Sequence, residues 1–193
     1  MNGGLYNGVM LRNRLPLLIT GVAGVAGYNA FHYLHHQYPG QVVGIRPHQT
    51  SKLVGPGLIA QDAEDAAGMH SLFERFGFRS VLNCVGNCAL KSCELDPAMA
   101  HTVNVHSAFV LADLVRRHDA RLVHLSSDLV FSGTRGGHHV ESDPTDPVTI
   151  YGKTMVQAED VFLTKTPSAA ILRISLPMGP SVNHHAGAID WIQ

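Results

Sequence analysis

Three glycines spaced three residues apart form a turn that phosphate groups could approach closely. Gly21, Gly24 and Gly27 lie in the sequence TGVAGVAG, between a short apolar run and a helical pattern. Gly21 can make a tight turn, Gly24 lets a pyrophosphate approach the backbone, and Gly27 lets the helix pack closely on the strand. The helix start offers unpaired N–H groups, those of Val25 and Ala26 among them, and a positive dipole end. The spacing predicts dinucleotide binding; a turn that serves only packing is the alternative.

The end of the next apolar run bears on which nicotinamide cofactor binds. An NAD site has Asp or Glu about 20 residues past the turn, where it bonds the ribose 2′-hydroxyl. Residues 41–51 contain no acid, and the expected strand ends at Arg46, whose cation suits a 2′-phosphate. We therefore expect NADP rather than NAD, although Arg46 as an ordinary solvated strand end is the alternative. Asp62 is a candidate partner for the adenine amino group.

The elements that must position these residues alternate along the chain. The expected strands are 15–20, 41–46, 58–61, 80–85, 121–126 and 169–175, and the expected helices are 25–38, 63–76, 96–118 and 151–164. Asp96 and Pro97 supply an N-cap and a first helical position. Strands that alternate with helices form parallel βαβ units. The sequence therefore predicts the α/β class: a doubly wound, mostly parallel sheet with helices on both faces, the Rossmann fold.

Composition excludes several classes of protein. The chain has 193 residues, 45% of them hydrophobic and 15% charged, which is not the composition of a disordered chain. Its 14 basic and 15 acidic residues give a net charge of −1, so neither nucleic acid nor an anionic membrane is an expected partner. No apolar run reaches the roughly 18–20 residues of a membrane span.

Cysteine and histidine usage indicates no metal centre. Cys84, Cys88 and Cys93 do not form a disulfide framework, and we see no signal peptide, so we expect a cytoplasmic protein. The chain has 13 histidines, but neither C-x-x-C nor H-E-x-x-H occurs. Surface and half-buried imidazoles are the expected interpretation, with no metal bound.

Two further motifs carry a resemblance to a known family. SSDLVF at residues 126–131 and YGKT at 151–154, taken with the glycine turn, resemble the extended short-chain dehydrogenase/reductase family. The most similar branch is that of the dTDP-4-dehydrorhamnose reductases, which reduce sugar nucleotides with NAD(P)H. The resemblance covers about residues 15–179. It implies a nucleotide-sugar or related carbonyl substrate and leaves a homo-oligomer open.

The resemblance also implies roles for particular residues. Ser127 would hydrogen-bond the substrate carbonyl oxygen, and Tyr151 would give that oxygen its proton while also contacting the cofactor. The backbone at Cys84, Val85 and Gly86 would face the cofactor. Without the resemblance, Ser127 could be a strand-ending hydroxyl bonded to a nearby turn, and Tyr151 a capping aromatic residue.

Two departures from the family pattern leave alternatives open. The family places lysine four residues after the tyrosine, where a cation lowers the tyrosine pKa, and here that residue is Met155. Lys153 does not substitute, because it points about 200° away around the helix. The family also builds its substrate lobe after the sixth strand, so we expect a flexible tail at 1–14, an NAD(P)-binding domain at 15–179 and a truncated substrate region at 180–193.

Three functions follow from these features. The first is an NADP-dependent reductase of a keto-sugar nucleotide, impaired by Met155. The second is a non-catalytic NADP-binding or regulatory module, and the third a relative of the nucleotide-sugar epimerases and dehydratases.

Overall fold

Six parallel strands form a single sheet in the order β3-β2-β1-β4-β5-β6. This computed structural model of the chain describes residues 13–180 and residue 182. The strands are β1 (Leu17–Thr20), β2 (Val42–Arg46), β3 (Leu58–Ala60), β4 (Ser80–Asn83), β5 (Arg121–Ser127) and β6 (Ala170–Ile174). Each of the six predicted strands is present, and every pairing between neighbours is parallel. The predicted α/β fold class is confirmed.

The helices agree with the sequence pattern except between β4 and β5. They are α2 (Val25–Gln37), α3 (Ala66–Phe76), α4 (Leu90–Leu95), α5 (Pro97–His101), α6 (Ser107–Arg117) and α7 (Ile150–Lys165), with a π-helical turn η1 (Thr102–His106) and a 3-10 turn η2 (Asp128–Val130). The predicted helix over 96–118 is divided into α5, η1 and α6. The short helix α4 was not predicted.

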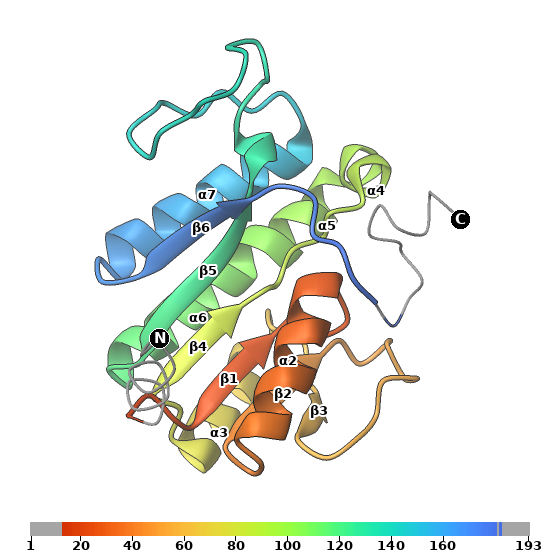
Figure 1. Cartoon of the computed structure of the whole chain (residues 1–193), viewed down its shortest axis with the longest axis vertical. Coiled ribbons are helices and arrows are strands. Elements are labelled where there is room, and N and C mark those ends of the chain that lie inside the picture. The colour runs from red at the N-terminus through yellow and green to blue at the C-terminus, as the bar shows by residue number, and fades with distance from the viewer. Residues whose placement is uncertain (1–12, 181, 183–193) are drawn as a thin grey trace, which may run out of the picture.

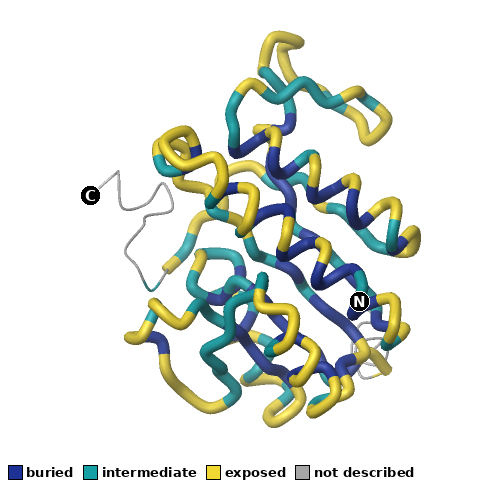
Figure 2. Tube along the Cα trace, turned by 180° about the vertical axis from the view of Figure 1, so that it is seen from behind, coloured by how far each residue is buried: buried dark blue, intermediate teal, exposed yellow. Residues whose placement is uncertain are grey.

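Alternate residues of the central strands enter two different hydrophobic clusters. Leu17 and Ile19 of β1 point to the side of α2, where they pack with Phe31, whereas Leu18 packs with residues of α3, α6 and α7. In Figure 1, α2 lies in front of the sheet, and α6 and α7 lie behind it. Seen from behind, buried and exposed stretches alternate along these helices (Figure 2). The predicted helices on both faces are therefore present.

Side-chain caps set where three helices begin. The Asp65 carboxylate accepts hydrogen bonds from two first-turn amides of α3, so that helix begins three residues later than predicted. The Asp96 side chain accepts from Met99 N at 2.9 Å, with Pro97 in the first turn, as the sequence predicts. The Thr149 hydroxyl caps α7 by accepting from Gly152 N at 3.0 Å.

The order of the strands reverses between β1 and β4. The chain moves outward through β2 and β3 and returns to place β4 beside β1, with Thr20 paired to Asn83 at their carboxyl ends. In open parallel sheets, ligands bind at this kind of reversal. The fold therefore directs attention to the loops that follow Thr20 and Asn83.

Parts of the predicted organisation lie outside the described residues. This holds for residues 1–12 of the expected tail, and for 181 and 183–193 of the expected substrate region. Within the described part of the chain, no helix has the length and apolar character needed to cross a membrane.

Candidate active site

The glycine turn lies at the carboxyl end of β1, where the backbone is too crowded for side chains at two positions. Gly21 has a φ of +67°, and a Cβ there would collide with the carbonyl group of Cys84. A Cβ on Gly27 would collide with the Gly21 carbonyl and lie 3.0 Å from Val22 Cα. Gly21 therefore permits the turn and the approach of the β4 loop, and Gly27 permits the close contact between α2 and the turn that follows β1.

Gly24 differs from its two neighbours because its Cα faces open space. A Cβ there would meet only the Gly21 carbonyl oxygen, at an ordinary 3.6 Å. Gly24 is also the N-cap of α2, and no side chain supplies the cap hydrogen bond. First-turn amides such as those of Val25 and Ala26 lack acceptors within a helix. An open glycine in front of uncapped amides fits a pyrophosphate group.

Arg46 ends β2 and Asp62 follows β3, and both are bonded within the loops around them. Arg46 Nε donates to Leu53 O at 2.5 Å and Nη1 to Pro47 O at 3.0 Å. Asp62 accepts from His48 N at 3.1 Å and lies 2.9 Å from His48 Nδ1. Among residues 13–180 and 182, none accepts from Arg46 Nη2, so that nitrogen keeps its two N–H groups for an anion.

The loop after β4 lies against the glycine turn. Cys84 N donates to Thr20 Oγ1, and Val85 N donates to Asn83 Oδ1, each at 3.2 Å. Burial raises the pKa of the Cys84 thiol to about 12, so it is a neutral packing group rather than a nucleophile. The predicted trio Cys84, Val85 and Gly86 thus stands beside the turn that would hold a cofactor.

The structure brings the Ser127 and Tyr151 hydroxyls into one environment. Ser127 ends β5, and its Oγ accepts from Leu129 N at 3.1 Å while donating to Asp128 Oδ1 at 3.2 Å. Tyr151 lies in the first turn of α7 and is 8% exposed. Burial raises the pKa of Tyr151 to about 12, Cys88 adds to the rise, and the nearby Ser127 hydroxyl opposes it. Ser127 therefore caps a turn and also faces Tyr151.

Met155 occupies the position one helical turn beyond Tyr151. It is 2% exposed and packs with Tyr151, Cys93, Ala100 and Val130. No cation is among the groups that shift the pKa of Tyr151. The place where the resembled family has an ammonium group is a buried apolar cluster in this chain.

Asn104 links the β4 loop to the helix that carries Tyr151. Its Oδ1 accepts from Asn87 N, and its Nδ2 donates to Thr154 Oγ1, both at 2.8 Å. Thr154 Oγ1 in turn donates to the Tyr151 carbonyl at 2.9 Å. Asn104 lies in the π-helical turn η1, a distortion that often accompanies functional sites. No role was predicted for Asn104; an amide between two valines within a helical pattern was the available signal.

Known proteins resemble the chain in sequence over most of its length. The sequence model of a family described as "RmlD substrate binding domain" matches residues 15–186. The dTDP-4-dehydrorhamnose reductase of Aggregatibacter actinomycetemcomitans is 32% identical over 114 residues, which are 59% of this chain and 39% of that protein. Methionine adenosyltransferase 2 subunit beta of Pongo abelii is 28% identical over 163 residues, which are 84% of this chain and 47% of that protein.

A solved structure agrees with the fold. The dTDP-4-dehydrorhamnose reductase (rfbD) from Bacillus anthracis str. Ames, in complex with NADP, gives a TM-score of 0.71 at 21% identity, over 83% of this chain and 53% of that one. At this identity the likeness concerns the fold alone. Across these three proteins, the chain spans between 39% and 53% of the length of its relative.

Proposed function

The chain belongs to the RmlD substrate-binding-domain family, and on that premise we propose that it binds a nicotinamide dinucleotide and reduces the carbonyl group of a nucleotide-linked keto-sugar. The observation that carries the proposal is the position of Ser127 at the carboxyl end of β5 and of Tyr151 in the first turn of α7, at the same sheet edge as the glycine turn. A hydride donor and a carbonyl oxygen would meet between these groups. The relatives named as dTDP-4-dehydrorhamnose reductases support this substrate class.

The roles of the protein groups follow from their positions. A bound nicotinamide would supply the hydride. The Ser127 hydroxyl would turn from Asp128 to hydrogen-bond the substrate oxygen, which develops negative charge as the hydride arrives. Tyr151 would donate its phenolic proton to that oxygen. The Asn104 bridge would hold the Tyr151 helix in register with the loop that faces the cofactor.

The cofactor is proposed to be NADP. Gly24 and the uncapped first turn of α2 would take the pyrophosphate, and Arg46 Nη2 would take the 2′-phosphate. Asp62 keeps its proposed place near the adenine, although His48 already bonds it. Replacing Arg46 by Gln should weaken NADPH binding by roughly tenfold or more and leave NADH binding unchanged. Equal losses for both cofactors would contradict this assignment.

Binding and turnover should be measured in sequence on the full chain. Calorimetry with NADPH and NADH tests the cofactor step. Oxidation of NADPH is then followed with dTDP-4-dehydrorhamnose and related keto-sugar nucleotides, with Tyr151→Phe as the matched variant. The proposal expects turnover that the variant lacks. The whole proposal would be overturned if neither NADPH nor NADH bound to the chain.

The apolar surroundings of Met155 favour a second candidate, a cofactor-binding module without catalysis. The lysine of the resembled family is replaced by a buried thioether, and burial raises the pKa of Tyr151 to about 12. One relative is named as a subunit of another enzyme, methionine adenosyltransferase 2. Tight NADPH binding together with no oxidation on any keto-sugar nucleotide would favour this candidate over the reductase.

A further inference from the structure

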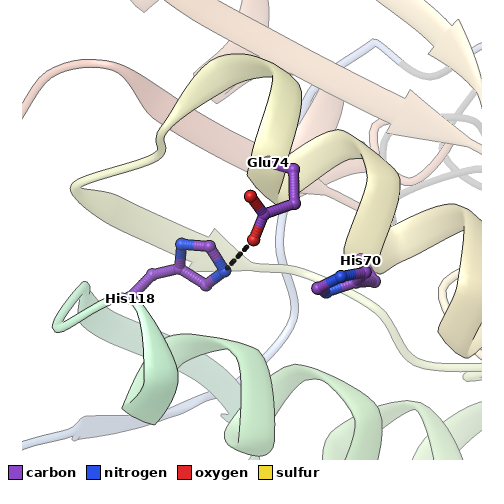
Figure 3. Close-up of side chains that lie close together, drawn as sticks. All are labelled: His70, Glu74 and His118. Atoms are coloured by element: carbon purple, nitrogen blue, oxygen red, sulfur yellow. Dashed lines mark ion pairs between the residues drawn. The ribbon is translucent and has the colours of Figure 1, made fainter.

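Three side chains with metal-binding chemistry meet on the surface between α3 and α6. His70 and Glu74 are four residues apart on α3 and so share one helix face. His118 directly follows the last residue of α6. One donor atom from each residue can be chosen so that all three lie within 4.8 Å of one another. Figure 3 shows His118 approaching Glu74 from the end of its helix, with His70 one turn away on α3.

The distances are close to those of a transition-metal site. Zinc is held by imidazole nitrogens and carboxylate oxygens at about 2.0–2.2 Å, so two ligands of a tetrahedron lie about 3.3 Å apart. His118 Nε2 and Glu74 Oε1 are already 3.5 Å apart. His70 is exposed, so rotation of its side chain can bring its ring nitrogen to the same spacing.

The surrounding structure fixes His118 and leaves the other two residues free to adjust. The His118 ring packs on Phe73 with centroids 5.2 Å apart, and its backbone N donates to Leu114 O at 3.0 Å. Its side chain is 22% exposed, against 62% for Glu74. One ligand is therefore held in place, and two flexible ligands from α3 can close around an ion.

The cluster lies near the amino ends of the parallel strands, whereas the candidate active site lies at their carboxyl ends. His118 comes just before β5 begins and Glu74 just before β4 begins, whereas the glycine turn follows the carboxyl end of β1. His70 also lines a hollow of about 280 Å³ between α3 and α6, together with His106, Asp113 and Arg117. A fourth coordination position would open toward water here, as three-ligand zinc sites allow.

We propose that His70, Glu74 and His118 form a site for a divalent transition-metal ion, with Zn²⁺ as the best match to two imidazoles and one carboxylate. The ion would tie the middle of α3 to the end of α6. Sequence spacing alone does not reveal this site, because the third ligand comes from a different helix 44 residues further along the chain. The proposal is independent of the proposed reductase activity.

Zinc titration of the full chain tests the proposal. Calorimetry should show a binding step with one zinc ion per chain, and saturating zinc should raise the unfolding temperature by roughly 5 °C. His70→Ala and His118→Ala should each weaken this step at least tenfold, and Glu74→Gln should weaken it while keeping the shape of the side chain. Cobalt substitution should give the visible absorption of a tetrahedral ion in the parent chain and lose it in the variants.

A matched control excludes a simpler explanation. His32 and His36 are both exposed and lie four residues apart on α2, so this pair could also chelate a metal. The double variant His32→Ala/His36→Ala should leave the zinc step unchanged. The proposal is overturned if the step survives His70→Ala and His118→Ala, or if the α2 variant abolishes it. Circular dichroism checks that each variant is folded, and unchanged NADPH affinity would separate this site from the cofactor site.

Discussion

Met155 faces Gly86, since a Cβ in place of a Gly86 hydrogen would stand 3.7 Å from Met155 Sδ. The contact joins the loop after β4, which would face a cofactor, to the helix that carries Tyr151. Met155 also packs against Tyr151 itself. Met155 therefore lies between the loop after β4 and Tyr151, so a charge at this position would act on both.

Replacing Met155 by Lys should lower the pKa of Tyr151 from its raised value of about 12. A unit charge at about 4 Å in an effective dielectric near 20 contributes roughly 4 kcal/mol, so the shift is at most about three pKa units. Ultraviolet difference titration of tyrosinate, with Tyr151→Phe to assign the signal, measures this change. If the chain is a reductase, its rate should also rise by roughly two decades or more.

Met155→Leu serves as the control because it keeps the apolar volume without the charge. It should leave the Tyr151 titration where it is. A folded Met155→Lys variant with an unshifted titration would contradict the expected effect, because it would mean that the ammonium group points away from the phenol.

Two glycine substitutions should separate cofactor binding from folding. Gly27→Ala places a Cβ into the backbone of the glycine turn, so we expect it to destabilise the fold by roughly 1–3 kcal/mol. Gly24→Ala meets only one atom, at 3.6 Å, so its unfolding midpoint should change little while NADPH affinity falls at least tenfold. Urea unfolding and calorimetry on both variants check this pair. Full NADPH affinity in Gly24→Ala would show that no pyrophosphate approaches this glycine.

Local sequence signals predicted the parts of the fold that depend on local chemistry. The alternation of apolar runs with helical patterns gave all six strands, and the Asp96-Pro97 pair gave the start of α5. The glycine spacing predicted a turn whose crowding at Gly21 and Gly27 the structure confirms. Each of these features is determined by residues within a few positions of one another.

Features that depend on distant contacts were not visible in the sequence. The π-helical turn arises where Asn104 bonds both Asn87 and Thr154, and no propensity signals such a bridge. The six residues of α4 are too few to show a period. The bonds that tie Arg46 to the Pro47 and Leu53 carbonyls likewise depend on the path of a loop.

The buried ion pair between Glu159 and Arg173 should respond unequally to loss of either partner. Arg173 Nη2 donates to Glu159 Oε2 at 2.7 Å, and Ser126 Oγ donates to Glu159 Oε1 at 2.5 Å. The side chain of Glu159 is 3% exposed and that of Arg173 is 24% exposed. Arg173→Met strands a buried carboxylate and should cost roughly 3–5 kcal/mol of unfolding free energy. Glu159→Gln should cost less, because the guanidinium group can reach water.

The surface pair of Lys165 and Asp113 provides the comparison for this prediction. Its atoms are 3.0 Å apart, but the two side chains are 34% and 40% exposed. Lys165→Met should therefore cost less than about 1 kcal/mol. Equal losses in Lys165→Met and Arg173→Met, measured by urea unfolding, would contradict the argument from burial.

His124 should make the fold less stable in mild acid. Asn83 Oδ1 accepts from Thr20 and Val85, so Asn83 Nδ2 donates to His124 Nδ1 at 3.0 Å. The ring is then neutral with its proton on Nε2, which has no partner among the described residues. Burial lowers the pKa of His124 to about 4, although the charge of Glu159 opposes this.

The sign of the pH dependence follows from the lowered pKa. Between the ordinary histidine pKa of about 6.5 and the folded value of about 4, the unfolded chain binds a proton that the folded chain does not. As the pH falls through this window, the unfolding free energy should decrease by roughly 1.4 kcal/mol per pH unit, or about 3 kcal/mol in total. Hydrogen bonds also lower the pKa values of Asp65 and Asp146. The stability that these two carboxylates contribute is therefore lost only at more acidic pH, below their ordinary pKa of 3.8.

Urea unfolding of the parent chain and of His124→Gln between pH 4 and pH 7 measures how much His124 contributes to the pH dependence of stability. The two aspartates contribute equally to both proteins. The variant should lose most of the slope, since glutamine can still accept from Asn83 but does not titrate. Parallel curves for the parent chain and His124→Gln would mean that the imidazole takes up its proton in the folded state, most directly by turning Nε2 toward a carboxylate such as that of Glu159.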